Sequence, residues 1–531
     1  MTSVLKTRNL HKQFVKDDQG IVALRDFDLD IEQGGFVSVL GRSGCGKSTM
    51  LNLLAGLTTP TSGEVLYRDE PVTKPRIEVG YLTQSDTLMP WRTVRRNIEM
   101  PMELRGVPSG TRRERADELI ERVGLGGFDR HYPRELSGGM RRRVSLARML
   151  ACDPETLLMD EPFGALDAQL RHDLQKELLR LWQGSGQTVV FVTHDIEEVP
   201  LARRPRRRPR PPRPRRPRRD RRPAPPPRPR RVPRRPPVRR PPPQNDRRTP
   251  RGGTMSADTI KGSAPETVPV QRSFWAKNGT TVLVWTARIV LVAALLLVWQ
   301  WAADRWFDVI FTSRPSEIWN RLVQWHQDDI LWSNTWVTVQ EILYGFALGA
   351  AAGVVLGFLL ASATLVYRVL DPFIMALYSI PKVALAPLFI VWFGIGMNMK
   401  VLLAAATVFF LVFLNTVAGV RQVDQGLIDA VRLMGGGRWQ ITFKVVLPGS
   451  MTGVLTGLKV AIPYALIGAV IGELVASNRG LGYLINDAAA QFDTAGVFAT
   501  LVVLSVIAAV LNLLVGLLDR RLSRWKPVEA R

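Results

Sequence analysis

The pattern of apolar and polar positions changes twice along this chain. Up to about residue 200 the apolar runs are short. Residues 4–40 alternate apolar and polar side chains with turn residues between them, which predicts antiparallel β-strands, and the runs at 36–40, 79–82 and 188–193 are typical of buried strands. Residues 199–254 show no apolar periodicity, and from residue 255 onward the apolar runs become much longer. The pattern therefore predicts an α/β domain, an irregular tract and a helical domain.

Six apolar runs in the last stretch are long enough to cross a hydrocarbon core about 30 Å thick. They lie at 285–301, 339–360, 374–394, 401–420, 454–475 and 497–518. Their number and length exclude ordinary buried core helices. The third run contains Pro381 and Pro387, which we expect neighbouring helices to accommodate. Six spans place both ends of the stretch on one side, and the excess of Lys and Arg in the loop at 421–444 and in the tail predicts that this side is the cytoplasm.

Charge and cysteine content narrow the function classes. The 531 residues carry a formal net charge of +24, but the tract at 203–251 holds 23 arginines and two aspartates. That tract contributes 23 − 2 = +21, which leaves 24 − 21 = +3 for the rest of the chain. The basicity is therefore not the signature of a folded nucleic-acid-binding surface. Two cysteines, Cys45 and Cys152, imply no disulfide framework, and the first residues show no apolar core of a signal peptide.

A glycine-rich loop between the apolar run at 36–40 and a helical pattern at 49–57 fits the phosphate-binding motif G-x-x-x-x-G-K-[ST]. Its glycines let backbone amides turn toward a phosphate, and the following helix directs its positive end at the same anion. Lys47 would reach the outer phosphates, and the Ser48 hydroxyl would ligate Mg²⁺. The residues expected to bind nucleotide in this loop are Gly41, Arg42, Ser43, Gly44, Cys45, Gly46, Lys47, Ser48 and Thr49.

Four further motifs follow the loop in order. Gln84 lies after the apolar run at 79–82, a Ser-Gly-Gly turn at 137–139 opens a basic amphipathic helix, Asp160 and Glu161 end a buried strand, and His194 ends another. Each alone has a structural explanation as a helix cap, a turn residue or a structural histidine. Their common order and spacing behind a phosphate loop indicate nucleotide hydrolysis.

Over residues 1–198 these motifs resemble the ATP-binding subunits of ABC transporters. The signature at 136–140 ends in Met140, where many members have glutamine, as is common in importers of nitrate, taurine and alkylsulfonates. The resemblance implies two catalytic residues: Glu161 as general base on the attacking water and His194 at the γ-phosphate. The metal ligands that it implies for Mg²⁺ are Ser48, Gln84 and Asp160.

The same resemblance implies further contacts to ATP. Ser137, Gly138 and Gly139 would face the ATP held by a second copy, so that the active site forms only between two such domains. Phe14 would stack on the base, although an aromatic side chain at this position could also belong to the core.

The last stretch resembles permeases of the nitrate, sulfonate and taurine importers over essentially all of residues 275–525. The segment at 428–450 follows the pattern of their cytoplasmic coupling loop, with mild departures. The coupling-loop residues expected from this pattern are Asp429, Ala430, Gly435, Leu447 and Pro448. Glu473 lies within or near the end of the fifth apolar run, and two interpretations stay open: a functional intramembrane acid or a water-exposed residue at a helix end.

The tract at 199–254 separates an ATP-binding domain at 1–198 from a permease domain at 255–531. Residues 200–250 hold 19 of the chain's 37 prolines, so no packed core is expected there. Because the resembling fold normally continues past His194, we expect the ATPase domain to lack its C-terminal part. Composition favours a frameshift in a GC-rich gene, with Met255 as the start of a separate permease gene. The alternative is a genuine polybasic linker.

The predicted fold class is an α/β P-loop ABC ATPase domain followed by an all-α, six-span membrane domain like a type I ABC importer permease. The resemblance implies ATP and Mg²⁺ as cofactors. It implies three partners, namely a second copy of the subunits, an extracytoplasmic solute-binding protein and the lipid bilayer, with no nucleic acid. The expected function is ATP-driven import of a small solute across the cytoplasmic membrane, in the first place an anion such as nitrate, taurine or an alkylsulfonate. Alternatives are uptake of a thiamine-precursor-like heterocycle, two separate subunits joined artefactually, and a nucleic-acid ATPase, against which the six spans argue.

Overall fold

The computed structural model describes residues 3–16, 19–42, 44–163, 171, 175, 186–193, 274–303, 305–306, 309–522 and 525. The chain forms two units, Met1–Arg204 together with Leu295–Arg531, and Pro205–Ala294. Of the second unit only residues 274–294, the first part of helix α6 (Phe274–Ala302), are described. The predicted tract at 199–254 and the predicted domain limits at 198, 199, 254 and 255 lie outside the described residues.

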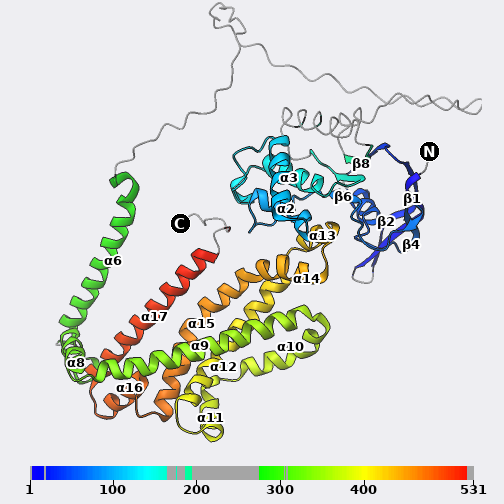
Figure 1. Ribbon diagram of the computed structural model, residues 1–531. Coiled ribbons are helices and arrows are strands. Elements are labelled where there is room, and N and C mark those ends of the chain that lie inside the picture. Colours follow the sequence, from blue (N-terminus) through cyan, green and yellow to red (C-terminus); the bar gives the residue numbers. More distant parts are fainter. Residues whose placement is uncertain are drawn as a thin grey trace, which may run out of the picture. The chain divides into compact units, whose positions relative to one another are not determined.

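The N-terminal part of the first unit contains two four-stranded sheets (Figure 1). Its elements are β1 (Ser3–Lys16), β2 (Gln19–Glu32), β3 (Phe36–Leu40), α1 (Lys47–Leu54), β4 (Ser62–Tyr67), β5 (Glu70–Pro71), β6 (Val79–Leu82), α2 (Val94–Leu104), α3 (Ser109–Arg122), η1 (Pro133–Glu135), α4 (Gly138–Leu150), β7 (Thr156–Asp160) and β8 (Thr188–Thr193). One sheet has the order β2-β1-β4-β5 and is antiparallel, as the alternating pattern predicts. The other has the order β3-β8-β7-β6 and is parallel.

The parallel sheet sets the position of the site. Every residue of β7 and β8 is buried, which explains why these strands are continuous apolar runs rather than alternating ones. Leu40 pairs with Thr193, and Asp160 pairs with Val192. The carboxyl ends of these strands therefore lie at one edge of the sheet, where the polar residues that follow them meet.

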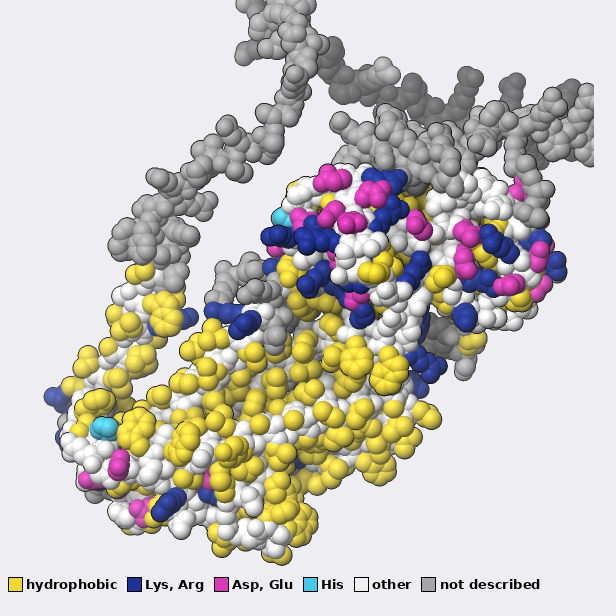
Figure 2. All heavy atoms as spheres, viewed as in Figure 1, with side chains coloured by type: hydrophobic (Ala, Val, Ile, Leu, Met, Phe, Trp, Pro, Cys, Tyr) yellow, Lys and Arg dark blue, Asp and Glu magenta, His cyan; other side chains and the backbone are white. Residues whose placement is uncertain are grey.

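The C-terminal part is helical, and hydrophobic side chains cover the visible faces of its helices (Figure 2). Its elements are α7 (Val309–Thr312), α8 (Pro315–Gln327), α9 (Ile330–Ser362), α10 (Thr364–Ser379), η3 (Lys382–Leu385), α11 (Ala386–Phe393), α12 (Met397–Arg421), α13 (Gln425–Leu433), α14 (Arg438–Ile441), η4 (Thr442–Val446), α15 (Leu447–Ala476), α16 (Leu481–Ala490) and α17 (Thr494–Leu522). Among the described residues, five helices are long and apolar enough to span a membrane, or six if one bent pair counts as a span. They correspond to the predicted apolar runs.

The third predicted span, at 374–394, is not one unbroken helix. The chain breaks between α10 and the η3–α11 segment, and the two halves meet at 84°. The break lies at Ile380, whose extended backbone (φ −66°, ψ 126°) is the conformation that a following proline favours. Pro381 in addition lacks the N–H that would continue the helix. Pro381 therefore ends the helix here, whereas Pro387 lies in the first turn of α11, where a proline is tolerated.

Glycines determine how closely the central helices pack. The helix α12 packs along both α9 and α15 (Figure 1). On α9, glycine recurs at every fourth position from Gly345 to Gly357. A Cβ at Gly349 would lie 2.4 Å from the carbonyl oxygen of Ala405 on α12, and a Cβ at Gly345 would lie 2.5 Å from the Ala404 Cβ. This small-residue stripe lets the two backbones approach to a distance that no larger side chain would permit.

Candidate functional site

The phosphate loop connects β3 to α1, as predicted. Gly44 and Gly46 have φ values of +83° and +91°, and a Cβ at Gly46 would lie 2.3 Å from the Ala23 carbonyl oxygen. The Lys47 ammonium group donates to the carbonyl oxygens of Gly41 at 2.7 Å and Arg42 at 2.8 Å. Lys47 is therefore held inside the loop that its own backbone forms. Cys45 is exposed and Thr49 lies in the first turn of α1, whereas Ser43 lies outside the described residues.

Two of the predicted metal ligands lie in contact at the edge of the parallel sheet. The Ser48 hydroxyl hydrogen-bonds the carboxylate of Asp160, which ends β7 and is buried. Burial raises the pKa of Asp160 above its ordinary value, and the hydrogen bond from Ser48 opposes this shift. A hydroxyl oxygen and a desolvated carboxylate are oxygen ligands of the kind that Mg²⁺ takes, so the residues present fit the ion.

The proposed base lies beside the predicted glutamine. The Gln84 amide nitrogen donates to the Glu161 carboxylate at 3.3 Å. Glu161 has a positive φ of 45°, and its backbone N–H donates to the Val192 carbonyl oxygen of β8 at 2.9 Å. Such a left-handed conformation is costly for a residue other than glycine and occurs often at functional sites. The structure thus brings Ser48, Gln84, Asp160 and Glu161 together.

Sequence reasoning missed Arg142, which joins these parts. Its buried guanidinium group extends from α4 and donates to the backbone carbonyls of Asp160 (2.9 Å), Glu161 (3.1 Å), Pro162 (2.9 Å) and Gln84 (3.3 Å). One side chain therefore fixes both the end of β7 and the segment that carries Gln84. The only sequence signal was its place among three consecutive arginines on an amphipathic helix, because the residues that it binds lie far away in the sequence.

A second buried arginine on α4 fixes the next residues of the same segment. Arg148 donates to the carbonyl oxygens of Thr87 at 2.7 Å and Asp86 at 3.2 Å, and Ser145 donates to the Asp86 carbonyl at 2.8 Å. Burial lowers the pKa of Arg148 to about 10, so this side chain remains protonated at neutral pH. The segment after Gln84 is thus held by charged hydrogen bonds to α4.

The other predicted nucleotide contacts lie apart from this edge. Ser137 is exposed and caps α4, where its hydroxyl accepts from the Met140 N–H at 3.3 Å, and Gly138 and Gly139 form the first turn of that helix. Phe14 on β1 is 44% exposed with the Lys12 ammonium 5.0 Å from its ring centre, so the alternative that it belongs to the core is wrong. His194 lies outside the described residues.

The predicted coupling loop at 428–450 runs from the short helix α13 to the start of α15, and α13 contacts the segment after Gln84. Ala430 is buried in an apolar cluster with Met89, Met100 and Cys152. A Cβ at Gly426 would lie 3.3 Å from the Thr87 methyl group, and a Cβ at Gly435, whose φ is +85°, would lie 2.9 Å from Ile77. Among the predicted coupling residues, Ala430 and Gly435 thus meet the N-terminal part directly.

Three of the predicted coupling residues have other contacts. Asp429 pairs with Arg432 on its own helix at 2.9 Å, and Leu447 and Pro448 begin α15. The polar contacts to the N-terminal part come from residues that the sequence pattern did not indicate. Lys444 forms an ion pair with Glu103, and the Gln440 amide donates to the Leu104 carbonyl oxygen at 3.1 Å.

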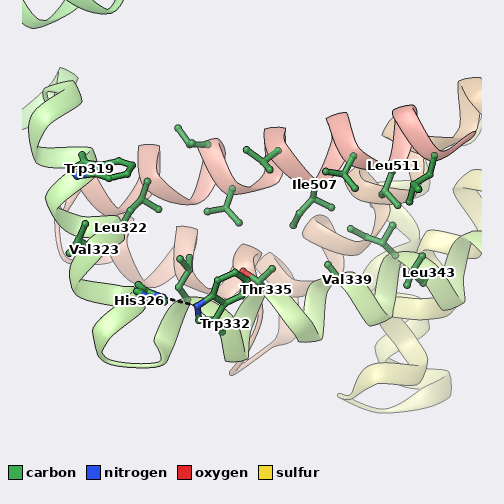
Figure 3. A pocket seen from close by; sticks show the side chains of 17 residues that line it. Trp319, Leu322, Val323, His326, Trp332, Thr335, Val339, Leu343, Ile507 and Leu511 are labelled. Carbon is green, nitrogen blue, oxygen red and sulfur yellow. Dashed lines mark hydrogen bonds between the residues drawn. The ribbon is translucent and has the colours of Figure 1, made fainter. Parts of the chain in front are cut away.

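A separate cavity of about 710 Å³ lies between α8, α9 and α17 (Figure 3). Its lining is almost entirely aliphatic and aromatic, and its polar groups include His326, whose Nδ1 accepts from the Trp332 Nε1–H at 2.7 Å. Among the described residues, no Lys, Arg, Asp or Glu side chain lines it. This chemistry does not suit an anion, so we do not assign the cavity to a charged substrate.

Comparison with known proteins matches both parts of the chain. The ABC transporter family matches residues 24–164, and the family of binding-protein-dependent transport system inner membrane components matches residues 353–524. An uncharacterized ABC transporter ATP-binding protein of Methanocaldococcus jannaschii is 49% identical over 194 residues, which cover 36% of this chain and 73% of that protein.

Two named relatives are importer subunits. The taurine import ATP-binding protein of Yersinia pestis is 49% identical over 180 residues, covering 34% of this chain and 71% of the relative. The nitrate import ATP-binding protein of Synechocystis sp. is 45% identical over 201 residues, which cover 38% of this chain and 76% of that protein. A solved dimeric ATP-binding cassette bound to ADP and Pi is 35% identical and covers 37% of this chain and 90% of its own, at a TM-score of 0.35.

Proposed function

This chain belongs to the ABC transporter family, with an importer-type ATPase and a permease on one polypeptide, and we propose that it imports a small anion by hydrolysing ATP. The observation that carries the proposal is the contact of α13 with the segment after Gln84. That segment leaves the catalytic edge of the sheet at Gln84 and reaches the permease helix at Thr87 and Met89. Movement at the nucleotide is thereby transmitted to the membrane helices.

In the proposed reaction, the phosphate loop and Lys47 bind the phosphates of ATP. Ser48 and Asp160, with Gln84 nearby, would hold Mg²⁺, which would supply positive charge beside the phosphates. Glu161 accepts a proton from the attacking water, and Gln84 orients its carboxylate. Arg142 fixes the positions of Glu161 and Gln84 relative to each other through hydrogen bonds to their backbone carbonyls. We place His194 at the γ-phosphate, Phe14 at the base, and Ser137, Gly138 and Gly139 at the ATP of a second copy.

The proposed substrates are small anions such as nitrate, taurine or an alkylsulfonate. Support comes from the names of the taurine and nitrate import relatives. We propose that a solute-binding protein outside the cytoplasmic membrane delivers the anion, that two copies of this chain form the transporter, and that the ATPase lies in the cytoplasm. Binding measurements on the solute-binding protein encoded beside this gene test the substrate class, and affinity for sugars or peptides alone would remove the anion assignment.

We further propose the domain limits 1–198, 199–254 and 255–531, with the Arg/Pro-rich tract in place of the end of the ATPase domain. The coverage of the relatives is in line with this proposal, because the matched residues span 71–76% of each relative and leave about a quarter of each unmatched. Resequencing the gene around codons 199 and 255 tests whether a frameshift produced the tract. An unbroken frame through Arg203–Arg251 would establish the fused chain instead.

Replacing Glu161 by Gln tests the catalytic proposal. The variant removes the proton acceptor but keeps the phosphate loop and the metal ligands. We therefore expect the reconstituted transporter to bind ATP normally while hydrolysis falls about 10²- to 10⁴-fold. The matched control is Glu155→Gln at the opposite end of β7, which should hydrolyse ATP at the wild-type rate. Near-normal turnover of the Glu161 variant would refute the assignment.

A further inference from the structure

Three buried charged side chains meet within the membrane domain, and the reaction proposed above uses none of them. Glu341 on α9 is 0% exposed, Lys400 on α12 is 5% exposed and Glu473 on α15 is 1% exposed. The alternative that Glu473 is a water-exposed residue at a helix end is therefore wrong. Lys400 lies near the start of α12 and Glu473 near the end of α15, so the cluster is far along both helices from the coupling helix α13. Charged groups in such an apolar setting are costly and usually functional.

The hydrogen bonds around Glu473 are nearly complete. Its carboxylate accepts from the Thr338 hydroxyl at 2.7 Å and from the Gly482 N–H at 2.6 Å. Thr338 in turn accepts from the Leu481 N–H at 2.8 Å, and Asn334 accepts from the Gly480 N–H at 2.7 Å. The cluster therefore holds the first turn of α16 against α9, with a carboxylate at the positive end of the α16 helix.

Glycines leave the space for this arrangement. A Cβ at Gly480, where φ is +113°, would lie 2.1 Å from a carboxylate oxygen of Glu473. A Cβ at Gly472 would lie 2.9 Å from the Lys400 side chain. The sequence GELVASNRGLG at 472–482 thus provides a carboxylate together with the space that its partners need.

The charges of the cluster do not balance without a further positive charge. Lys400 pairs with Glu341 and lies 3.1 Å from the Ser477 hydroxyl. Thr338, which donates to Glu473, lies three residues before Glu341 on α9, so the two carboxyl groups are neighbours and interact with each other. Within the described residues, the buried Oε2 atom of Glu341 has no donor, and Lys400 is the only cation paired with either carboxylate.

Within the part of the chain that the structure describes, the other groups that face the pair are neutral. They are Asn334 and Thr338 on α9, Ser477 after α15, and the backbone amides of 480–482, whereas the nearby Arg479 is exposed. Two carboxylates and one ammonium group leave a net charge of −1 in a setting of low polarity. One proton between the two carboxyl groups makes the cluster neutral and supplies the missing donor.

We propose that Glu341 and Glu473 form a proton-binding site in the membrane domain, in which the two carboxyl groups share one proton and Lys400 balances the remaining charge. With the proton bound, the cluster keeps the start of α16 fixed to α9. When the proton leaves to water, the two carboxylates repel each other and the contact to the 480–482 segment loosens. Proton occupancy thereby controls the end of the permease remote from the ATPase, independently of the transported anion.

Infrared spectroscopy of the purified full chain tests the site without any transport assay. We expect the wild type to show the C=O stretch of a protonated, buried carboxylic acid that shifts in D₂O. Glu341→Gln and Glu473→Gln should each abolish the band, because the remaining carboxylate then balances Lys400 without a proton. The matched control Glu317→Gln on α8 should keep the band. Absence of the band from the wild type, or its persistence in both variants, would overturn the proposal.

Hydrogen exchange tests the proposed consequence. After correction for intrinsic exchange rates, protection of the Leu481 and Gly482 amides should fall with rising pH in the wild type but stay constant in Glu341→Gln. Identical pH profiles in the two proteins would refute control by a proton. Replacing sodium by choline should leave the wild-type profile unchanged, and a sodium requirement would assign the site to a metal cation instead.

Discussion

Glu103 of α2 and Lys444 of η4 form an ion pair between positions 341 residues apart in the sequence. Arg92 holds the same carboxylate at 2.6 Å. The ATPase and the permease are thus joined by a charged contact beside the apolar cluster in which α13 is buried. Because Glu103 is only partly exposed, this contact is less screened by salt than an ordinary surface pair.

Reversing one charge of this pair should weaken the coupling. We expect Lys444→Glu to place two carboxylates together and to lower the ratio of transport to ATP hydrolysis, by the equivalent of about 1 kcal/mol or more. The double variant Glu103→Lys with Lys444→Glu should recover part of the ratio. Lys6→Glu, which breaks an exposed pair with Asp69, is the control. If the double variant is as defective as the single one, the contact does not act as a pair.

The same contact should not titrate near neutral pH. Burial alone would raise the pKa of Glu103, but hydrogen bonds from Arg92 and Lys444 outweigh it and lower the pKa to about 2. A lowered pKa means that the stabilisation is present above the ordinary pKa of glutamate and is lost as the pH falls through about 2. We expect the coupling ratio to stay constant between about pH 5 and about pH 8 as far as this pair is concerned. Loss of coupling in Glu103→Gln at all of these pH values would agree with this.

Gly435 should tolerate no large side chain. Gly435 has a positive φ, and a Cβ there would contact Ile77. We therefore expect Gly435→Arg to displace α13 from the apolar cluster in which it is buried. ATP binding should persist, because the phosphate loop is untouched, while transport per ATP hydrolysed falls. Gly437 is the matched control, since a Cβ there meets no atom within 4 Å. Normal transport by Gly435→Arg would show that α13 is not the docking element.

Arg142 should affect hydrolysis more than nucleotide affinity. In Arg142→Met the carbonyls of Asp160, Glu161 and Gln84 lose their common donor, so the base and the glutamine drift from their positions. We expect kcat to fall about a hundredfold with little change in KM for ATP, and Arg142→Lys to restore only part of the rate. The adjacent Arg143 donates instead to the carbonyls of Val123 and Gly124, so Arg143→Met should leave kcat close to normal. Equal losses in both variants would indicate a general effect on α4.

Motifs that are local in the sequence were predictable, and contacts between distant segments were not. The phosphate loop, the strands before Gln84 and Asp160, and the helix opened by the Ser-Gly-Gly turn at 137–139 depend on neighbouring residues, and the structure has them as predicted. Arg142 and Lys444 act through partners many positions away, so no local pattern marks them. The role of Glu473 stayed open for the same reason, because Glu341 and Lys400 lie on two other helices.

The bend in the third apolar segment differs from these long-range contacts, because the residue that causes it can be recognised in the local sequence. Pro381 follows Ile380 directly, and a residue before proline avoids the helical backbone. Apolar length favoured a continuous span, but the local backbone restriction prevailed. Length and composition therefore identify which segments enter a membrane better than they identify where a helix is interrupted.

The glycine stripe of α9 also limits how this permease can move. Helices that touch backbone to backbone at 345 and 349 have no flexible side chains between them to absorb a sliding motion. Any displacement of α12 must therefore carry α9 with it, so that the two helices move as one rigid body. The bend at Ile380 lies at the end of α10, the helix that follows α9, and there the chain can change direction without disturbing the α9–α12 contact.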